Sequence, residues 1–214
     1  MFGVQLKWSR YPDGVEVVDL GGPSIPLDAM EIENPLKTKG KWFCAKTATR
    51  EVYQLTLADL EDTLLIKFIN ARTDNQRCSF IARYGIPGFR EDDHFLIQYG
   101  RVIGFQSRLL ELLESTDIDA FNNNWHPTGN TYKAYLVRGE RGPEFVFRAA
   151  GLDNYMCTEA AFSITNGAEL FRCNHCDDAF LTGPLTWRRS HAKYCSDRCR
   201  VAAMRLRNKS QEKA

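Results

Sequence analysis

The sequence Cys173-Asn-His-Cys176, followed by eighteen residues and then by Cys195-Ser-Asp-Arg-Cys199, decides how the C-terminal part of this chain folds. The four cysteines form two close pairs in the sequence. Only two or three residues separate the cysteines of each pair, so both sulfurs can reach one metal ion. The intervening segment is long enough to fold the second pair back onto the first. Four thiolates favour a closed tetrahedral structural site, in which Zn²⁺ is the natural occupant. The sequence therefore predicts a zinc site formed by Cys173, Cys176, Cys195 and Cys199.

Each pair predicts its own local geometry. Cys173-x-x-Cys176 is typical of a zinc knuckle, a tight turn whose backbone N–H groups point at the sulfurs. Cys195 and Cys199 are four residues apart, so we expect both on one face of a helix that continues through the basic segment that follows. Ser196 and Asp197 suit the first turn of this helix, where short polar acceptors and negative charge are favoured.

The segment between the pairs predicts a β-hairpin. Phe180-Leu181 and Lys193-Tyr194 flank a polar turn at Gly183-Pro184 and indicate two short strands. A knuckle, a hairpin and a helix in this order indicate a treble-clef-like finger over residues 171–210. A zinc ribbon with two knuckles, a pair of disulfides and four ordinary reduced cysteines are the alternatives. The three-residue gap of the second pair and the helical sequence after it weigh against the ribbon.

Two histidines lie beside the cysteines in the sequence. His175 lies inside the knuckle and His191 lies four residues before Cys195, so either could replace a cysteine as a ligand. Because four cysteines already fill a tetrahedral shell, we expect both histidines to lie outside it.

The charge of the chain is unevenly distributed. The 28 Lys and Arg residues nearly balance the 27 Asp and Glu residues, but residues 171–214 alone carry ten basic and four acidic residues. That segment is therefore about +6 and the preceding 170 residues about −5. A Zn²⁺ ion with four thiolates contributes −2, which leaves the metal-loaded segment at about +4. Alternatively, some of the arginines could neutralise the thiolates by donating to sulfur.

The predicted C-terminal helix separates a metal-binding face from a basic face. Cys195, Cys199, Ala202 and Leu206 follow one face at helical spacing, and the arginines lie elsewhere on the helix. Arginine suits phosphate because its guanidinium donates two parallel hydrogen bonds. We therefore expect nucleic acid, either DNA or RNA, to bind Arg188, Arg189, Lys193, Arg198, Arg200, Arg205 and Arg207. The alternative is a protein-interaction or purely structural module whose basic face docks an acidic partner.

The whole chain predicts an α+β protein in four parts. Residues 1–55 form an N-terminal region of strands and loops, and residues 56–170 form a mainly helical core with a β-hairpin. The finger follows over residues 171–210, and residues 211–214 form a frayed tail.

Hydrophobic periodicity locates the individual elements. Val4–Trp8 and Val15–Val18 surround the turn signal Pro12-Asp13-Gly14 and predict an N-terminal hairpin, and residues 41–55 predict a further short strand or a packed loop. Helical spacing predicts helices from a Thr56 cap through Ile69 and over Asp74–Tyr84, Asp92–Glu114 and Asp153–Thr165. Alternation predicts a second hairpin formed by Tyr132–Val137 and Glu144–Arg148.

Other features of the sequence argue against several classes of protein. Cys44, Cys78 and Cys157 are scattered and odd in number, which argues against a disulfide framework and indicates reduced thiols. The N-terminus lacks the apolar core of a signal peptide, and no apolar run reaches the ~18 residues that a transmembrane helix needs. We therefore expect a cytoplasmic protein with no membrane partner.

An enzymatic role has weak candidates in the sequence. Glu91-Asp92-Asp93-His94 and Trp125-His126 could supply acid–base groups. An acidic cluster at a helix start first suits the helix dipole, and His126 in a polar loop is first a surface residue. The four cysteines of the finger leave no open metal position for a catalytic water. We therefore expect no enzymatic activity.

The finger resembles that of a known group of proteins. Cys173-x-x-Cys176, followed by Tyr194-Cys-Ser-Asp-Arg-Cys-Arg200 and alternating arginines, is similar to the C-terminal finger of uncharacterised bacterial proteins related to the CGNR zinc-finger group. Leu65–Ala71 and Phe80–Gly85 also resemble the helical region of those proteins, so the resemblance covers about residues 56–205. The Cys-Gly-Asn-Arg tetrad itself is absent, because Cys199 is followed by Arg-Val-Ala. The resemblance implies a helical domain, a C-terminal zinc finger and a nucleic-acid-binding or transcriptional role.

Overall fold

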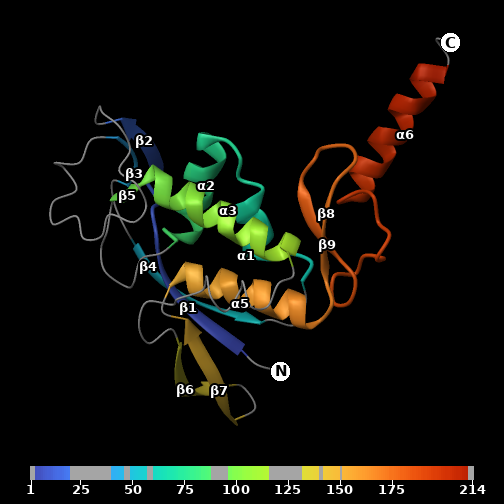
Figure 1. Cartoon of the computed structure of the whole chain (residues 1–214). Coiled ribbons are helices and arrows are strands. Elements are labelled where there is room, and N and C mark those ends of the chain that lie inside the picture. The colour runs from blue at the N-terminus through green and yellow to red at the C-terminus, as the bar shows by residue number, and fades with distance from the viewer. Residues whose placement is uncertain are drawn as a thin grey trace.

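The computed structural model describes residues 3–19, 40–45, 49–56, 60–87, 96–115, 132–139, 142–149 and 151–211. Within these ranges the chain has the predicted α+β architecture, with helices and small sheets followed by a cysteine-bearing C-terminal segment (Figure 1). The division of the chain into four parts stays a prediction.

A four-stranded mixed sheet forms one side of the molecule. Its strand order is β4-β1-β7-β6, in which β1 (Gly3–Arg10) pairs antiparallel with β4 (Thr49–Thr56) and parallel with β7 (Gly142–Ala149). β7 also pairs antiparallel with β6 (Tyr132–Gly139), so the predicted hairpin near residues 132–148 is confirmed. Figure 1 shows α5 (Leu152–Thr165) lying across this sheet.

A second, three-stranded antiparallel sheet has the order β2-β3-β5. It joins β2 (Val15–Asp19), β3 (Lys41–Ala45) and β5 (Leu96–Gln98). The predicted hairpin between residues 4–8 and 15–18 is therefore wrong, because β1 and β2 belong to different sheets. The turn between them exists, since the Gly14 N–H donates to the Tyr11 carbonyl at 2.9 Å, but the Tyr11 N–H donates to Ala82 of α2 and directs the chain into the second sheet.

Side chains cap the first two helices of the chain. Thr63 caps α1 (Leu64–Ile69), so the predicted cap at Thr56 is wrong, and Thr56 ends β4 instead. Thr73 and Gln76 form a capping box on α2 (Asp74–Tyr84), whose predicted bounds are confirmed. α3 (Tyr99–Ser115) begins later than predicted because residues 96–98 form β5, and residues 92–95 lie outside the described residues.

The helix α1 lies at the centre of the hydrophobic core. Its Leu65 and Phe68 side chains are fully buried, together with Ile81 of α2, Val102 of α3 and Met156 of α5. Burial of such a side chain contributes about 1.5–3 kcal/mol. Because a helix of one or two turns is unstable alone, α1 depends on this packing and on the groups that bond its ends.

Buried polar side chains from two other helices hold both ends of α1. The Glu159 carboxyl group of α5 accepts hydrogen bonds from the backbone N–H groups of Leu64 and Leu65 at 3.1 and 2.7 Å. At the other end, the Gln106 amide of α3 donates to three carbonyl groups, those of Phe68, Ile69 and Ala71. The position of α1, and of the turn that follows it, is therefore fixed.

The C-terminal segment follows directly from α5. It contains β8 (Glu169–Arg172), β9 (Ala179–Thr182) and α6 (Asp197–Gln211), and Figure 1 shows α6 extending away from the rest of the molecule. Among the described residues, no helix combines the length and the apolar character needed to cross a membrane.

Candidate metal centre

The first cysteine pair lies in a knuckle that closes the β8–β9 hairpin. Glu169 pairs with Thr182 and Arg172 with Ala179, so Cys173–Asp178 form the connection between the strands. The predicted pairing of residues 180–181 with residues 193–194 is wrong, because Lys193 and Tyr194 are not in a strand. Phe180 and Leu181 do form a strand, and it pairs with the residues before the knuckle.

The structure brings the four predicted cysteines together. The Sγ atoms of Cys173, Cys176, Cys195 and Cys199 all lie within 4.8 Å of one another. The Sγ of Cys176 is 3.6 Å from that of Cys195 and 3.7 Å from that of Cys199, and Cys195 and Cys199 are 3.5 Å apart at sulfur. These distances exclude disulfide bonds, which join sulfurs at about 2.05 Å. Four converging sulfurs could hold one metal ion.

The knuckle directs backbone N–H groups at its first cysteine, as the sequence predicts. Burial raises the pKa of the Cys173 thiol, but N–H groups of Cys176, Cys195 and His175 donate to its sulfur and lower the pKa to about 6. Asp177 closes the turn with φ of 61°, a left-handed conformation that aspartate tolerates better than most residues. These backbone hydrogen bonds therefore favour the thiolate form of Cys173.

A cation would favour the thiolate forms of Cys176 and Cys195. Burial and the neighbouring sulfurs raise the pKa of Cys176 and of Cys195 above the ordinary thiol value. Like charges at such short distances disfavour one another. A divalent cation at the centre of the four sulfurs would remove this conflict, so the site is suited chemically to a metal.

The second pair lies at the start of α6 and not wholly within it. The helix begins at Asp197, so Cys195 precedes it, and the prediction that both cysteines share a helix face is wrong. Ser196 caps the helix by accepting a hydrogen bond from the Cys199 N–H at 3.3 Å. Because the chain turns at Ser196, the Cys195 and Cys199 sulfurs still reach one point.

Neither histidine belongs to the cluster. Among the described residues, the group that could hold a metal ion consists of the four cysteines, and both His175 and His191 are exposed. The arginines make their polar contacts elsewhere: Arg172 pairs with Asp177 and Glu114, and Arg200 pairs with Asp197 at 3.1 Å. Arg172 and Arg200 therefore do not neutralise the cysteine sulfurs.

The predicted basic residues come from two parts of the finger, the helix α6 with the knuckle and the turn after β9. Arg198, Arg200, Arg205 and Arg207 lie exposed on α6, and the Lys193 carbonyl accepts from the Asn174 N–H at the knuckle. Arg188 instead pairs with Gly183 beyond the far end of β9. Four paired residues at about 3.3 Å each separate the Arg188 backbone from the knuckle by about 13 Å, but the Arg188 guanidinium lies over the ring of Phe180, the second residue of β9, at 5.9 Å from the ring centroid.

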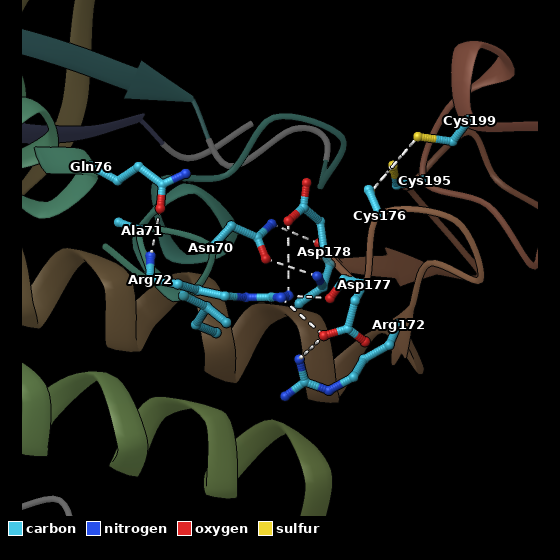
Figure 2. Close-up of polar contacts among 12 residues, drawn as sticks. Asn70, Ala71, Arg72, Gln76, Arg172, Cys176, Asp177, Asp178, Cys195 and Cys199 are labelled. Carbon is cyan, nitrogen blue, oxygen red and sulfur yellow. Dashed lines mark hydrogen bonds and ion pairs between the residues drawn. The ribbon is translucent and has the colours of Figure 1, made fainter. Parts of the chain in front are cut away.

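Sequence reasoning missed the contact that fixes the knuckle to the helical core. The Asn70 side chain, directly after α1, donates to the Ala179 carbonyl at 2.8 Å and accepts from the Ala179 N–H at 2.7 Å. Arg72 pairs with Asp177 at 2.9 Å and lies near Asp178 (Figure 2). The adjacent Asp177-Asp178 beside a metal ligand is the one signal in the sequence that could have indicated a cationic neighbour.

Known proteins give no further indication of function. Comparison of the chain with models of protein families, with curated proteins and with solved structures gives no match. The candidate acid–base groups at residues 91–94 and 122–126 lie outside the described residues.

Proposed function

We propose that the four cysteines bind one Zn²⁺ ion and that the finger they hold binds nucleic acid through α6. The zinc assignment rests on the donor set and on its size. A regular tetrahedron with zinc–sulfur bonds of about 2.3 Å has edges of about 3.8 Å. Three of the sulfur–sulfur distances are 3.6, 3.5 and 3.7 Å, close to that edge. All four positions around the ion are filled by protein, which suits a structural site rather than a catalytic one.

The exposure of α6 is the observation that carries the nucleic-acid proposal. None of its fifteen residues is buried, although the helix begins between Cys195 and Cys199 of the cluster. At 1.5 Å per residue it extends for about 22 Å. Because none of its side chains is buried against the described residues, this basic helix is available for a partner.

The arrangement of the arginines on α6 supports a phosphate-binding role. Arg200 and Arg207 lie seven residues apart on one line of the helix, and Arg198, Arg205 and Lys209 follow a second line. Only Asp197 contributes negative charge, through its exposed pair with Arg200, and such a pair is worth little in water. The two lines of positive charge suit a polyanion, whose phosphates would position the helix without specifying a sequence.

A protein partner is the second candidate. The side chains of Met204 and Leu206 are 48 % and 57 % exposed on the same helix, and such residues favour contact with another protein. An acidic protein surface would satisfy the arginines as well. The resemblance to CGNR-type fingers supports the nucleic-acid proposal, which we therefore place first, with a transcriptional role as its extension.

Charge reversal on α6 tests the proposal. We expect Arg205→Glu/Arg207→Glu to weaken the binding of zinc-loaded, full-length protein to DNA or RNA at low salt across all sequences, because phosphate contacts carry the affinity. The matched control is Arg83→Glu/Arg108→Glu, which makes the same change in net charge at exposed positions of α2 and α3. Elemental analysis checks that the zinc content stays unchanged.

The two variants separate the outcomes. A specific loss in the α6 variant supports the proposal. An equal loss in both variants would mean that net charge alone attracts nucleic acid, and undetectable binding to DNA and RNA at low salt would favour the protein partner.

A further inference from the structure

The turn between β9 and Arg188 presents one tryptophan to solvent. The Trp187 side chain is 83 % exposed, whereas the neighbouring Thr186 is fully buried. Trp187 has φ of 56° and Leu185 has φ of 62°, conformations in which L-residues are strained. An exposed, strained aromatic residue indicates a function, because folding alone would favour glycine or asparagine at such a position.

Buried contacts hold this turn in its shape. The Thr186 hydroxyl donates to the Gly183 carbonyl at 2.7 Å and accepts from the Arg188 N–H at 3.2 Å. The Leu185 carbonyl accepts from the Leu60 N–H at 2.7 Å, which ties the turn to the chain before α1. The Trp187 backbone is therefore fixed from both sides, and its ring projects outward.

The chain from Trp187 to Lys193 runs the length of the finger. It starts beside the bridge between Gly183 and Arg188 and reaches the knuckle, where the Lys193 carbonyl accepts from Asn174. Along it Arg189, His191 and Lys193 are exposed. No acidic residue occurs between Ala179 and Ser196, so this segment is uniformly neutral or positive up to the start of α6.

We propose that Trp187 is a stacking platform for an unpaired base, and that the nucleic acid bound by this protein is single-stranded. Bases stack on an exposed aromatic ring when they are not paired within a duplex. The phosphates of the same strand would follow Arg189 and Lys193 toward the arginines of α6, which joins the basic residues of the turn and of the helix into one path. This inference rests on the nucleic-acid proposal and adds the class of partner.

Oligonucleotides with and without bases test the platform in the full-length, zinc-loaded protein. The probes are oligothymidylate of about 10 nucleotides, within the usual range of about 4–16 for such sites, and an abasic strand of the same length and charge. We expect Trp187→Ala to weaken binding of oligothymidylate about 5- to 150-fold, the loss of one base–aromatic contact, and to leave the abasic strand unaffected. Trp187→Phe should restore most of the affinity.

A control in the same turn separates stacking from general apolar contact. Leu185 is 41 % exposed and also has a left-handed backbone, so Leu185→Ala removes apolar surface without removing a ring, and we expect unchanged affinity. Equal losses on the oligothymidylate and abasic strands, or no loss on either, would overturn the inference while α6-dependent binding could persist. Absence of binding to every nucleic acid would overturn the nucleic-acid proposal as well, and a Trp187-dependent affinity for an acidic peptide instead would assign the tryptophan to a protein partner.

Discussion

Asn70 and Ala179 exchange two hydrogen bonds across 109 residues of sequence, at 2.8 and 2.7 Å, and so join the turn after α1 to the first residue of β9. An asparagine side chain here replaces a neighbouring β-strand, since its amide offers one donor and one acceptor with the spacing of a backbone group. Because Ala179 directly follows the knuckle, the helical core positions the four-cysteine cluster.

Asn70→Asp should loosen this contact without removing the side chain. The aspartate keeps the acceptor for the Ala179 N–H but sets a second oxygen against the Ala179 carbonyl, which should cost about 1–3 kcal/mol. Hydrogen exchange at the Ala179 amide, and limited proteolysis between residues 166 and 172, should both become faster. The control is Asn75→Asp, the same change at an exposed position of α2, and equal effects of the two variants would contradict the proposed role of Asn70.

Local signals in the sequence predicted much of the fold. The bounds of α2 follow from Thr73, Gln76 and Gly85, which cap and end the helix within one segment. The cysteine spacing predicted the four-sulfur cluster, because a knuckle and a capped helix start each fix two sulfurs through nearby backbone. Both predictions depend on residues a few positions apart within one segment. Contacts with distant parts of the chain therefore have little influence on the helix bounds or on the geometry of each cysteine pair.

The wrong predictions concern which segments pair with one another in the folded chain. β1 and β2 are consecutive in the sequence, but the Tyr11 N–H donates to the Ala82 carbonyl of α2 and the two strands belong to different sheets. The Glu159 carboxyl group bonds to Leu64 and Leu65, and no local pattern indicates a contact over such a separation. The position of the four-cysteine cluster relative to the core could not be predicted for the same reason.

Stability should depend on pH through Glu159. Burial raises the pKa of this carboxyl to about 8 despite its hydrogen bonds from Leu65 and Leu64. The folded state therefore binds this proton more tightly than the unfolded state. The contribution of protonated Glu159 to the free energy of unfolding is complete below about pH 4 and is lost as the pH rises toward 8.

The expected slope is up to about −1.4 kcal/mol per pH unit within that window. Chemical denaturation at constant zinc, between about pH 5.5 and 8, measures it. The glutamine of Glu159→Gln cannot ionise, so the free energy of unfolding of this variant should lack the dependence on pH. Loss of one hydrogen-bond acceptor should lower that free energy by about 1–3 kcal/mol. The same slope in both proteins would show that another group controls the pH dependence.

Trp187→Gly should stabilise the protein. Relief of the left-handed backbone should contribute about 1–2 kcal/mol, and the greater freedom of glycine in the unfolded chain should offset about half of it. A net gain of about 0.5–1 kcal/mol should raise Tm by about 1–4 °C. Arg189→Gly is the control, since Arg189 is exposed and has no left-handed backbone. This variant should not raise the Tm of the protein. A lower Tm for Trp187→Gly would mean that the ring supports the fold.

Replacement of a cysteine of the cluster should remove the metal and unfold the finger alone. Zinc contributes about 10–16 kcal/mol to the folding of isolated finger peptides. We expect Cys176→Ser to lose the bound zinc and to expose the amides of residues 171–208 to hydrogen exchange, while the core around α1 stays protected. Cys78→Ser, outside the cluster, should keep one equivalent of zinc. Less than about half an equivalent in carefully prepared wild-type protein would contradict the zinc site.

The salt dependence of binding tests the central claim most directly, namely that the zinc-held helix α6 binds nucleic acid through its arginines. Each neutralised phosphate contributes about −0.7 to −0.9 to the slope of log K against log salt. Four contacts, one for each of Arg198, Arg200, Arg205 and Arg207, predict a slope of about −2.8 to −3.6 for zinc-loaded protein. Arg205→Glu/Arg207→Glu should reduce its magnitude by about half. A slope near zero, or one that the α6 variant leaves unchanged, would contradict the account.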